Sequence, residues 1–214
     1  VLLARATGCP VAVGPDRVAA AQALINKEQA DVILSDDGLQ HYPLNRLIEI
    51  AVVDGERGLG NGFSLPAGPL REPKSRLDDV DAVVVNGGSW VHEGAFRAKI
   101  VAQPLYQVVG SGQKSLEEFR DAEVHAVAGI ANPSRFFSLL EKAGVNVIRH
   151  PLPDHAKLNA ATLDFGDSLP VLVTEKDAVK CQSIAHRNVW CVPIKLKLDA
   201  ESGELLMQRI LMKL

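Results

Sequence analysis

The sequence has no long hydrophobic run and no cysteine framework. No apolar stretch approaches the roughly 18 to 20 residues that cross a bilayer, and no signal-peptide pattern occurs. The three cysteines, Cys9, Cys181 and Cys191, include no CxxC pair and no zinc spacing. An odd number of cysteines is more typical of a reducing compartment than of a disulfide framework, so a cytosolic protein is predicted. Because the chain opens without a Met, we also expect an upstream segment to be missing.

Clustered basic residues are missing as well. The formal net charge is -3, the pI is near 6.1, and Lys and Arg are scattered. Nucleic-acid affinity depends on cations gathered against phosphates, so no nucleic-acid partner is expected. The composition, with 47% hydrophobic and 23% charged residues, is that of a globular protein. Its 214 residues suffice for one large core or two small ones.

The first part of the chain alternates short β-branched runs with a helical stretch, as parallel strands buried on both faces do. Apolar residues at helical spacing predict a crossover helix over residues 17–29. The connection over residues 55–80 is rich in Gly and Pro, and an ordered loop of that length is usually functional. The predicted strands cover residues 11–13, 32–34, 48–53 and 82–85.

A second alternation of strands and helices begins at Val124. The elements before and within it are extended runs at 99–102 and 105–109, strands at 124–128, 145–148, 171–174 and 189–193, and helices at 133–143 and 201–214. The predicted fold class is therefore α/β, with a parallel sheet core joined by a short β linker to a second α/β unit. The predicted boundaries are residues 1–90, 91–117 and 118–214.

Two adjacent carboxylates, Asp36 and Asp37, follow the predicted strand at residues 32–34. Ligands of open α/β sheets bind outside the carboxyl ends of the strands, where a nucleotide kinase places a carboxylate to hold Mg²⁺. The alternative is that Asp-Asp-Gly only ends the strand in a turn, because these residues tolerate turn dihedrals. The residues alone do not decide between the two.

The segment from Gly58 to Pro73 is too irregular for a helix or a ladder strand. Its small residues allow a ligand to approach backbone amides, and Arg71 offers a forked donor for a phosphate. The alternative is a rigid surface loop with a solvated arginine. The combination of Asn61-Gly62, a Pro-Ala-Gly-Pro turn and Arg71-Glu72 favours the functional interpretation.

Other polar residues have structural interpretations. Thr174 is predicted to cap a helix whose first turn could present Glu175 and Lys176 to a ligand. Pro133 is predicted near the first position of another helix. Four histidines have no convincing partner in the sequence and are left out of the predicted site: His92, His125, His150 and His186.

The segments over residues 36–41 and 60–73 resemble the hallmark stretches of the tetraacyldisaccharide 4'-kinase family. Further similar stretches follow in the expected order at residues 81–88, 129–137, 153–155 and 173–180, so the resemblance covers essentially the whole chain. It implies a P-loop NTPase-like parallel sheet core and transfer of the γ-phosphoryl group of ATP, with Mg²⁺, to the 4'-hydroxyl of an acylated glucosamine disaccharide 1-phosphate. The implied product is lipid IV-A, made at the cytoplasmic face of the bacterial inner membrane.

The resemblance also implies roles for residues. Asp36 and Asp37 take a Walker B-like position as catalytic metal ligands. His155, which follows Asp154, is implied to reach a catalytic cleft between two lobes as base, orienter or phosphate ligand. The residues of the same motifs predicted to bind substrate are Gln40, His41, Asn61 and Arg71.

One feature departs from the family pattern, because no Gly-x-x-x-x-Gly-Lys-[Ser/Thr] motif occurs. The nearest stretch, Gly110 to Ser115, has Gln113 where the motif needs Gly and lies in the predicted linker. In the family the phosphate loop, a membrane-associating helix and an acidic catalytic motif precede the point where this chain starts. We therefore expect a fragment whose sheet core is incomplete at its N-terminus and whose membrane contact lies in the missing segment.

Two other hypotheses remain. The chain could be a catalytically incomplete fragment with only a lipid-binding or structural role. An ATPase-like regulatory protein would share the acidic pair but has no reason to carry the loop at residues 60–73. The codons upstream of Val1 would distinguish a fragment from a degenerate enzyme.

Overall fold

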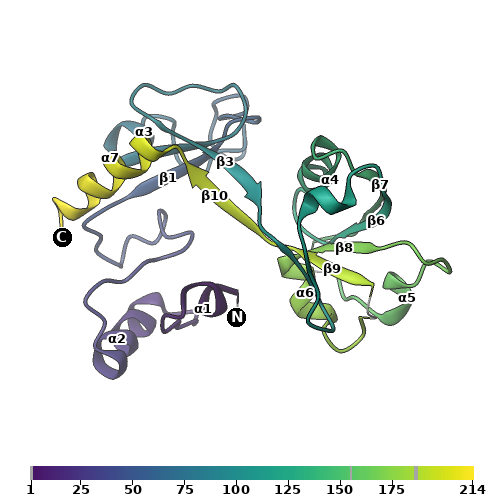
Figure 1. The fold of residues 1–214 in the computed structure, drawn as a ribbon. Coiled ribbons are helices and arrows are strands. Elements are labelled where there is room, and N and C mark those ends of the chain that lie inside the picture. The colour runs from purple at the N-terminus through teal and green to yellow at the C-terminus, as the bar shows by residue number, and fades with distance from the viewer. Residues whose placement is uncertain (1, 155, 186–187) are drawn as a thin grey trace. The chain divides into compact units, whose positions relative to one another are not determined.

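The computed structural model describes residues 2–154, 156–185 and 188–214 and divides the chain into two compact units. Unit 1 comprises Val1–Ile100 and Leu196–Leu214, and unit 2 comprises Val101–Lys195 (Figure 1). This division differs from the predicted boundaries 1–90, 91–117 and 118–214. It differs because the last strand and helix of the chain pack with unit 1.

Unit 1 is built on a four-stranded sheet with the order β1-β2-β3-β10. The strands are β1 (Ile50–Asp54), β2 (Ala82–Asn86), β3 (Phe96–Ala102) and β10 (Ile194–Leu198). β2 pairs in parallel with β1 and with β3. Helix α7 (Ala200–Leu211) places Leu206 in a cluster with Ala82, Val84 and Phe96 of this sheet, and this packing joins the C-terminal segment to unit 1.

The N-terminal part of unit 1 agrees only partly with the predicted βαβ pattern. Helices α1 (Leu2–Thr7) and α2 (Arg17–Glu28) form, and Asp16 caps α2 by accepting a hydrogen bond from Ala19 N at 2.9 Å. The predicted strands at 11–13 and 32–34 are wrong, since both runs are irregular and Val13 and Leu34 are each 92% exposed. No described strand pairs with either run, and an extended run without ladder hydrogen bonds has nothing to stabilise it.

Unit 2 contains a six-stranded sheet with the order β5-β4-β9-β8-β6-β7. Its central pairs β6–β7, β6–β8 and β8–β9 are parallel, whereas β4 pairs antiparallel with both β9 and β5. The strands are β4 (Leu105–Gln107), β5 (Gln113–Lys114), β6 (Glu123–Ala128), β7 (Asn146–Pro151), β8 (Val171–Thr174) and β9 (Val189–Val192). Apart from β5, which was not predicted, these strands agree with the β-branched runs from which they were predicted.

Short helices connect the strands of unit 2, and hydrophobic clusters form on the sheet. The helices are the 3₁₀ turn η1 (Leu116–Phe119), α4 (Pro133–Lys142), α5 (Ala160–Leu163) and α6 (Glu175–Cys181). One cluster gathers Phe137, Leu140 and Leu172, and the other gathers Val127, Val173 and Cys181. Two sheets with parallel strands and packed helices confirm the predicted α/β class.

Local signals in the sequence predicted several element boundaries correctly. Pro133 occupies the first turn of α4, and Thr174 caps α6 by accepting from Asp177 N. The phosphate-loop lookalike from Gly110 to Ser115 contains the edge strand β5 and leads into the 3₁₀ turn η1, not into an α-helix. Among the described residues, no helix combines the length and apolar character needed to cross a membrane.

Candidate active site

The acidic pair lies in an exposed turn of unit 1. Asp37 has a φ of +49°, a left-handed conformation that Asp tolerates better than most residues. Arg17, at the start of α2, donates from Nη1 to the carbonyl oxygens of Asp36 at 3.0 Å and Asp37 at 2.9 Å. Arg46 donates in the same way to the carbonyl oxygen of Gly38 at 2.7 Å. The two arginines therefore fix the backbone of the turn, and both aspartates are exposed.

The Gly- and Pro-rich loop at residues 58–73 is held together internally. Asn61 donates from Nδ2 to the carbonyl oxygen of Ala67 at 2.9 Å and accepts from Phe63 N at 3.2 Å. A Cβ on Gly68 would lie 2.1 Å from Asn61 Oδ1, so only glycine permits this approach. In this structure Asn61 supports the loop, and its role in binding substrate stays a prediction.

Arg71 joins the loop to the acidic turn. Its Nη1 donates to Asp37 Oδ1 at 3.1 Å, to Asp37 Oδ2 at 3.2 Å and to Gln40 Oε1 at 3.3 Å. Gln40 in turn donates from Nε2 to Glu72 Oε1 at 2.6 Å. The two segments that the sequence singled out are therefore in direct contact, through residues more than 30 positions apart in the sequence.

A less exposed charged network adjoins this contact. Glu72 accepts from Tyr42 Oη at 2.8 Å and pairs with Arg76 Nε at 3.2 Å, and Arg76 pairs with Glu49 at 2.6 Å. Arg46, which also fixes the acidic turn, pairs with Glu49 at 2.8 Å. The hydrogen bond from Gln40 is the largest cause that lowers the pKa of Glu72, while the bond to Glu72 raises the pKa of Tyr42. Glu72 therefore stays ionised, and it orders the residues beside Arg71.

His41 contributes an unpaired polar atom beside the same turn. Its backbone N–H donates to the carbonyl oxygen of Gly38 at 2.9 Å, which keeps the residue against the acidic segment. Its Nε2 is buried and, among the described residues, has no hydrogen-bond partner. Buried polar atoms are normally satisfied, so this nitrogen is available to a bound polar group. Among the predicted substrate-binding residues, His41 is thus the one whose buried ring nitrogen can still form a hydrogen bond with a ligand.

The carboxylates of the turn are the possible metal ligands. Within the described ranges, no three His, Cys, Asp or Glu side chains come together as a metal-binding group. Mg²⁺ keeps several waters and is often held by only one or two carboxylates, so an exposed aspartate pair suits it better than a closed cage would. The donor chemistry of Asp36 and Asp37 therefore fits Mg²⁺, with Asp37 also engaged by Arg71.

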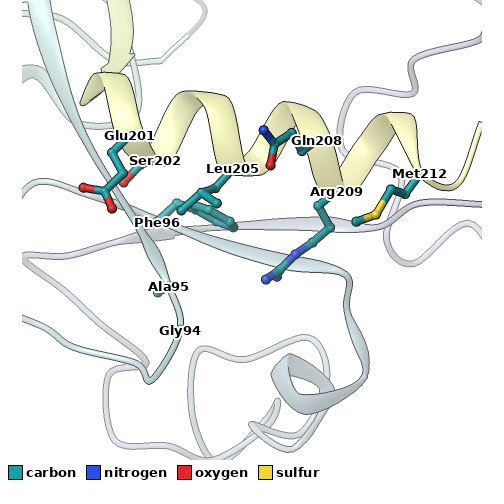
Figure 2. Close-up of a pocket in the computed structure, with 9 residues that line it drawn as sticks. All are labelled: Gly94, Ala95, Phe96, Glu201, Ser202, Leu205, Gln208, Arg209 and Met212. Atoms are coloured by element: carbon teal, nitrogen blue, oxygen red, sulfur yellow. The ribbon is translucent and has the colours of Figure 1, made fainter.

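A surface pocket of about 410 Å³ in unit 1 lies elsewhere, between α7 and the start of β3 (Figure 2). Arg209 on its wall lies over the ring of Phe96, 5.2 Å from the centroid, and donates to the carbonyl oxygen of Asp81 at 2.9 Å. None of the predicted site residues that the structure describes lines this pocket. The lining residues are Gly94, Ala95, Phe96, Glu201, Ser202, Leu205, Gln208, Arg209 and Met212.

In unit 2, three motif segments meet at the carboxyl ends of parallel strands. Gly129 follows β6, Asp154 follows β7, and Lys176 lies in the first turn of α6 after β8. Lys176 Nζ contacts Asp154 Oδ1 at 2.8 Å. Asp177, fully buried, accepts from Gly129 N at 2.9 Å and from Thr174 Oγ1 at 2.7 Å. This edge is where ligands of α/β sheets bind.

A family model described as tetraacyldisaccharide-1-P 4'-kinase matches residues 1–211. The chain belongs to this family. It is 50% identical over 209 residues to the tetraacyldisaccharide 4'-kinase of Alkalilimnicola ehrlichii, covering 95% of this chain and 61% of that protein. It is 51% identical over 203 residues to the protein of the same name from Nitrosococcus oceani, covering 95% and 60%. The chain thus spans about three fifths of the length of these relatives.

A solved structure shares the fold. The crystal structure of LpxK from Aquifex aeolicus in complex with ATP matches with a TM-score of 0.70 and 24% identity, covering 94% of this chain and 63% of that one. The predicted resemblance to the tetraacyldisaccharide 4'-kinase family is therefore confirmed, and so is the fold.

Not every predicted residue of the family site is described. His155 lies outside the described residues, and its catalytic role stays a prediction, as does its convergence with the acidic pair. The structure does bring Asp37, Gln40 and Arg71 together. Sequence reasoning missed the network around Glu49, although Arg46 three residues before it is a spacing typical of ion pairs.

The prediction that His125 and His150 have no partner is wrong. His125 Nδ1 lies 2.9 Å from His150 Nε2, and its Nε2 lies 3.0 Å from Asp167 Oδ2. His92 stacks on Trp90, with ring centroids 5.8 Å apart. No local sequence pattern predicts the His125–His150 contact, because the two histidines are 25 positions apart in the sequence.

Proposed function

We propose that this chain is the greater part of an ATP-dependent kinase of lipid A biosynthesis. The kinase transfers the γ-phosphoryl group of ATP to the 4'-hydroxyl of tetraacyldisaccharide 1-phosphate and yields lipid IV-A. Membership of the family and the names of its relatives support this reaction. The observation that carries the proposal is the contact of Arg71 with Asp37 and Gln40, because it unites the two motif segments in one site.

Asp36 and Asp37 are the residues that would hold Mg²⁺ in this site. When bound, Mg²⁺ neutralises charge on the phosphates of the nucleotide. The ion pair between Asp37 and Arg71 has side chains 67% and 62% exposed, so separating it costs no more than about 1 kcal/mol. Arg71 is then free to face a phosphate oxygen, and Asp37 is free to face a cation.

Phosphoryl transfer requires mainly positioning and stabilisation of charge. Arg17 and Arg46 hold the backbone of the acidic turn, so the two carboxylates keep their place when the Arg71 contact opens. Glu72 and Tyr42 keep Gln40 beside Arg71. The vacant Nε2 of His41 can bind a hydroxyl or a phosphate oxygen of a ligand.

The acceptor is an acylated glucosamine disaccharide 1-phosphate, and the enzyme acts at the cytoplasmic face of the inner membrane. The membrane contact is assigned to the part of the relatives that this chain does not span. His155 is assigned to the same reaction, and so is the Lys176–Asp154 pair at the strand ends of unit 2. The alternative is that the 214-residue chain alone is catalytically incomplete and serves only a lipid-binding or structural role.

One experiment tests the proposal and the alternative together. The N-terminal segment of the Alkalilimnicola relative is joined in frame before Val1, and transfer of labelled phosphate from ATP to the disaccharide is measured for this chimera and for the chain alone. We expect Mg²⁺-dependent product from the chimera and background from the chain alone, because a site without a phosphate loop holds the β and γ phosphates poorly. A folded chimera that makes no product would overturn the proposed reaction. Product from the chain alone would overturn the alternative.

A further inference from the structure

Unit 2 contains a row of three titratable side chains that the proposed reaction does not use. His125 on β6 is the central member and is buried, with 5% of its surface exposed. Its Nδ1 contacts His150 Nε2 on β7 at 2.9 Å, and its Nε2 contacts Asp167 Oδ2 at 3.0 Å. Asp167 belongs to the connection between α5 and β8, so the row ties this connection to two strands of the sheet.

Phe165 of the same connection completes the cluster. Its ring stacks on His125 with centroids 3.9 Å apart and on His150 with centroids 4.2 Å apart. The connection is also fastened by backbone, since His125 N donates to the carbonyl oxygen of Pro170 at 2.9 Å. We refer to Asp167, His125, His150 and Phe165 as the histidine clamp.

The 2.9 Å contact between the two rings limits how many protons the clamp can hold. With both rings neutral, His125 donates from Nε2 to Asp167 and accepts at Nδ1 from His150. With one added proton, the imidazolium of His125 donates to both neighbours, so every contact survives. With two added protons, both facing nitrogens carry hydrogen and neither can accept, so this hydrogen bond is lost.

Other charged groups near the clamp do not relieve that conflict. Arg149, adjacent to His150 on β7, pairs with Glu141 at 2.6 Å and lies over Phe137. Glu123 on β6 is exposed, α5 carries no charged residue, and Asp164 Oδ1 is occupied by Gly166 N. Among the described residues, Asp167 is therefore the anion that contacts the pair, and it can neutralise one imidazolium only.

We infer that the histidine clamp is an acid-sensitive device that fastens residues 164–170 to β6 and β7 and opens when both imidazoles are protonated. Desolvation lowers the pKa of His150, and the bond to His125 lowers the pKa of Asp167. The folded state disfavours protonated His150. The contribution of neutral His150 to stability is therefore complete above pH 6.5, the ordinary pKa of histidine, and is lost as the pH falls below that value. The contribution of Asp167 is lost only at lower pH, below its ordinary value of 3.8.

The functional meaning of the clamp rests on the proposed function. The chain that runs from β7, which carries His150 of the clamp, to α5 contains Asp154, which pairs with Lys176 at the strand ends of unit 2. An open clamp would release the His150 end of this chain from His125 on β6. The test below uses no substrate, so a failure of the kinase proposal and a failure of the clamp proposal are distinguishable.

The test measures the urea-induced unfolding of unit 2 between pH 5 and pH 8. In a Trp90→Phe background, the buried Trp190 is the only tryptophan left and reports on unit 2. We expect the unfolding constant to rise by up to about tenfold per pH unit below pH 6.5, the slope of one extra proton bound by the unfolded chain. His150→Gln should remove most of this slope, because the amide still donates to His125 but binds no proton. The matched control His92→Gln should leave the slope unchanged.

A slope that His150→Gln does not reduce would overturn the clamp. If this variant does not fold, the wild-type chain decides by NMR titration of its imidazoles. We expect one ring of the pair to stay neutral below pH 6.5, and residues 164–170 to lose protection from hydrogen exchange once it is protonated. Two rings that are fully protonated at pH 5.5 with residues 164–170 still protected would contradict the proposal.

Discussion

The two units bury their apolar side chains to different degrees. The strands of unit 2 carry hydrophobic clusters on the sheet, and Val124, Leu172 and Val189 are fully buried. In unit 1 the runs at 11–13 and 32–34 have the same kind of side chains, yet Val13 and Leu34 are 92% exposed. Apolar β-branched sequence therefore makes a strand only where a neighbouring strand is present to pair with it. The candidate site lies in unit 1, on loops whose backbone is fixed by hydrogen bonds from charged side chains.

The largest effect is expected at the acidic pair. In the full-length chimera, Asp36→Ala or Asp37→Ala should lower kcat by at least about 100-fold, because a metal ligand contributes several kcal/mol to transition-state stabilisation. Stability should change by less than about 1 kcal/mol, since both side chains are exposed. Steady-state transfer rates and urea unfolding measure the two effects. Asp31→Ala, a nearby exposed aspartate, is the control, and wild-type turnover in both site variants would refute the metal assignment.

The contrast in packing predicts different responses to the same substitution. Leu172→Ala should destabilise unit 2 by about 2 to 5 kcal/mol, because it leaves a cavity in a fully buried position. Leu34→Ala should change stability by less than about 0.5 kcal/mol in the 214-residue chain. Chemical unfolding of the two variants measures the difference. Equal losses would show that the run at 32–34 is packed after all.

A smaller effect is expected at His155. In the chimera, His155→Ala should lower kcat at least about tenfold, or 1.4 kcal/mol of transition-state stabilisation, with little change in thermal stability. Its kcat and KM at several pH values, compared with those of His92→Ala, measure the effect. If both parameters stay near wild type, His155 is not part of the site.

The smallest expected difference between the two units is in the reactivity of their cysteine thiols. Desolvation by burial raises the pKa of Cys181 to about 11 and that of Cys191 to about 12, both in unit 2. Cys9 in unit 1 is exposed. Only the thiolate is nucleophilic, so a disulfide reagent at pH 8 should modify one thiol of the folded chain rapidly and the other two only after denaturation. Rapid reaction of all three would contradict the packed core of unit 2.

Much of the fold could be predicted from local sequence patterns. These predictions succeeded where the chain itself supplies the neighbouring strand or helix that an element needs. The runs at 171–174 and 189–193 became paired strands, and Thr174 became the expected cap. The exposed runs could not be predicted, since burial depends on neighbours that a pattern does not specify. In the site, Asp37 and Arg71 were identified by their motifs. The Gln40–Glu72 bond and the His125–His150 pair were not, because tertiary contacts over 25 or more residues leave no periodic signal.

The proposed site requires Arg71 and Asp37 to act together in phosphoryl transfer. A double-mutant cycle in the chimera tests it, with kcat/KM for transfer of labelled phosphate measured for Asp37→Asn, Arg71→Gln, the double variant and the parent. We expect kcat/KM of the double variant to fall by clearly less than the product of the two single losses, since each substitution already disables the same site. Single losses that multiply fully in the double variant would show that Arg71 and Asp37 act independently, and would rule out a shared site.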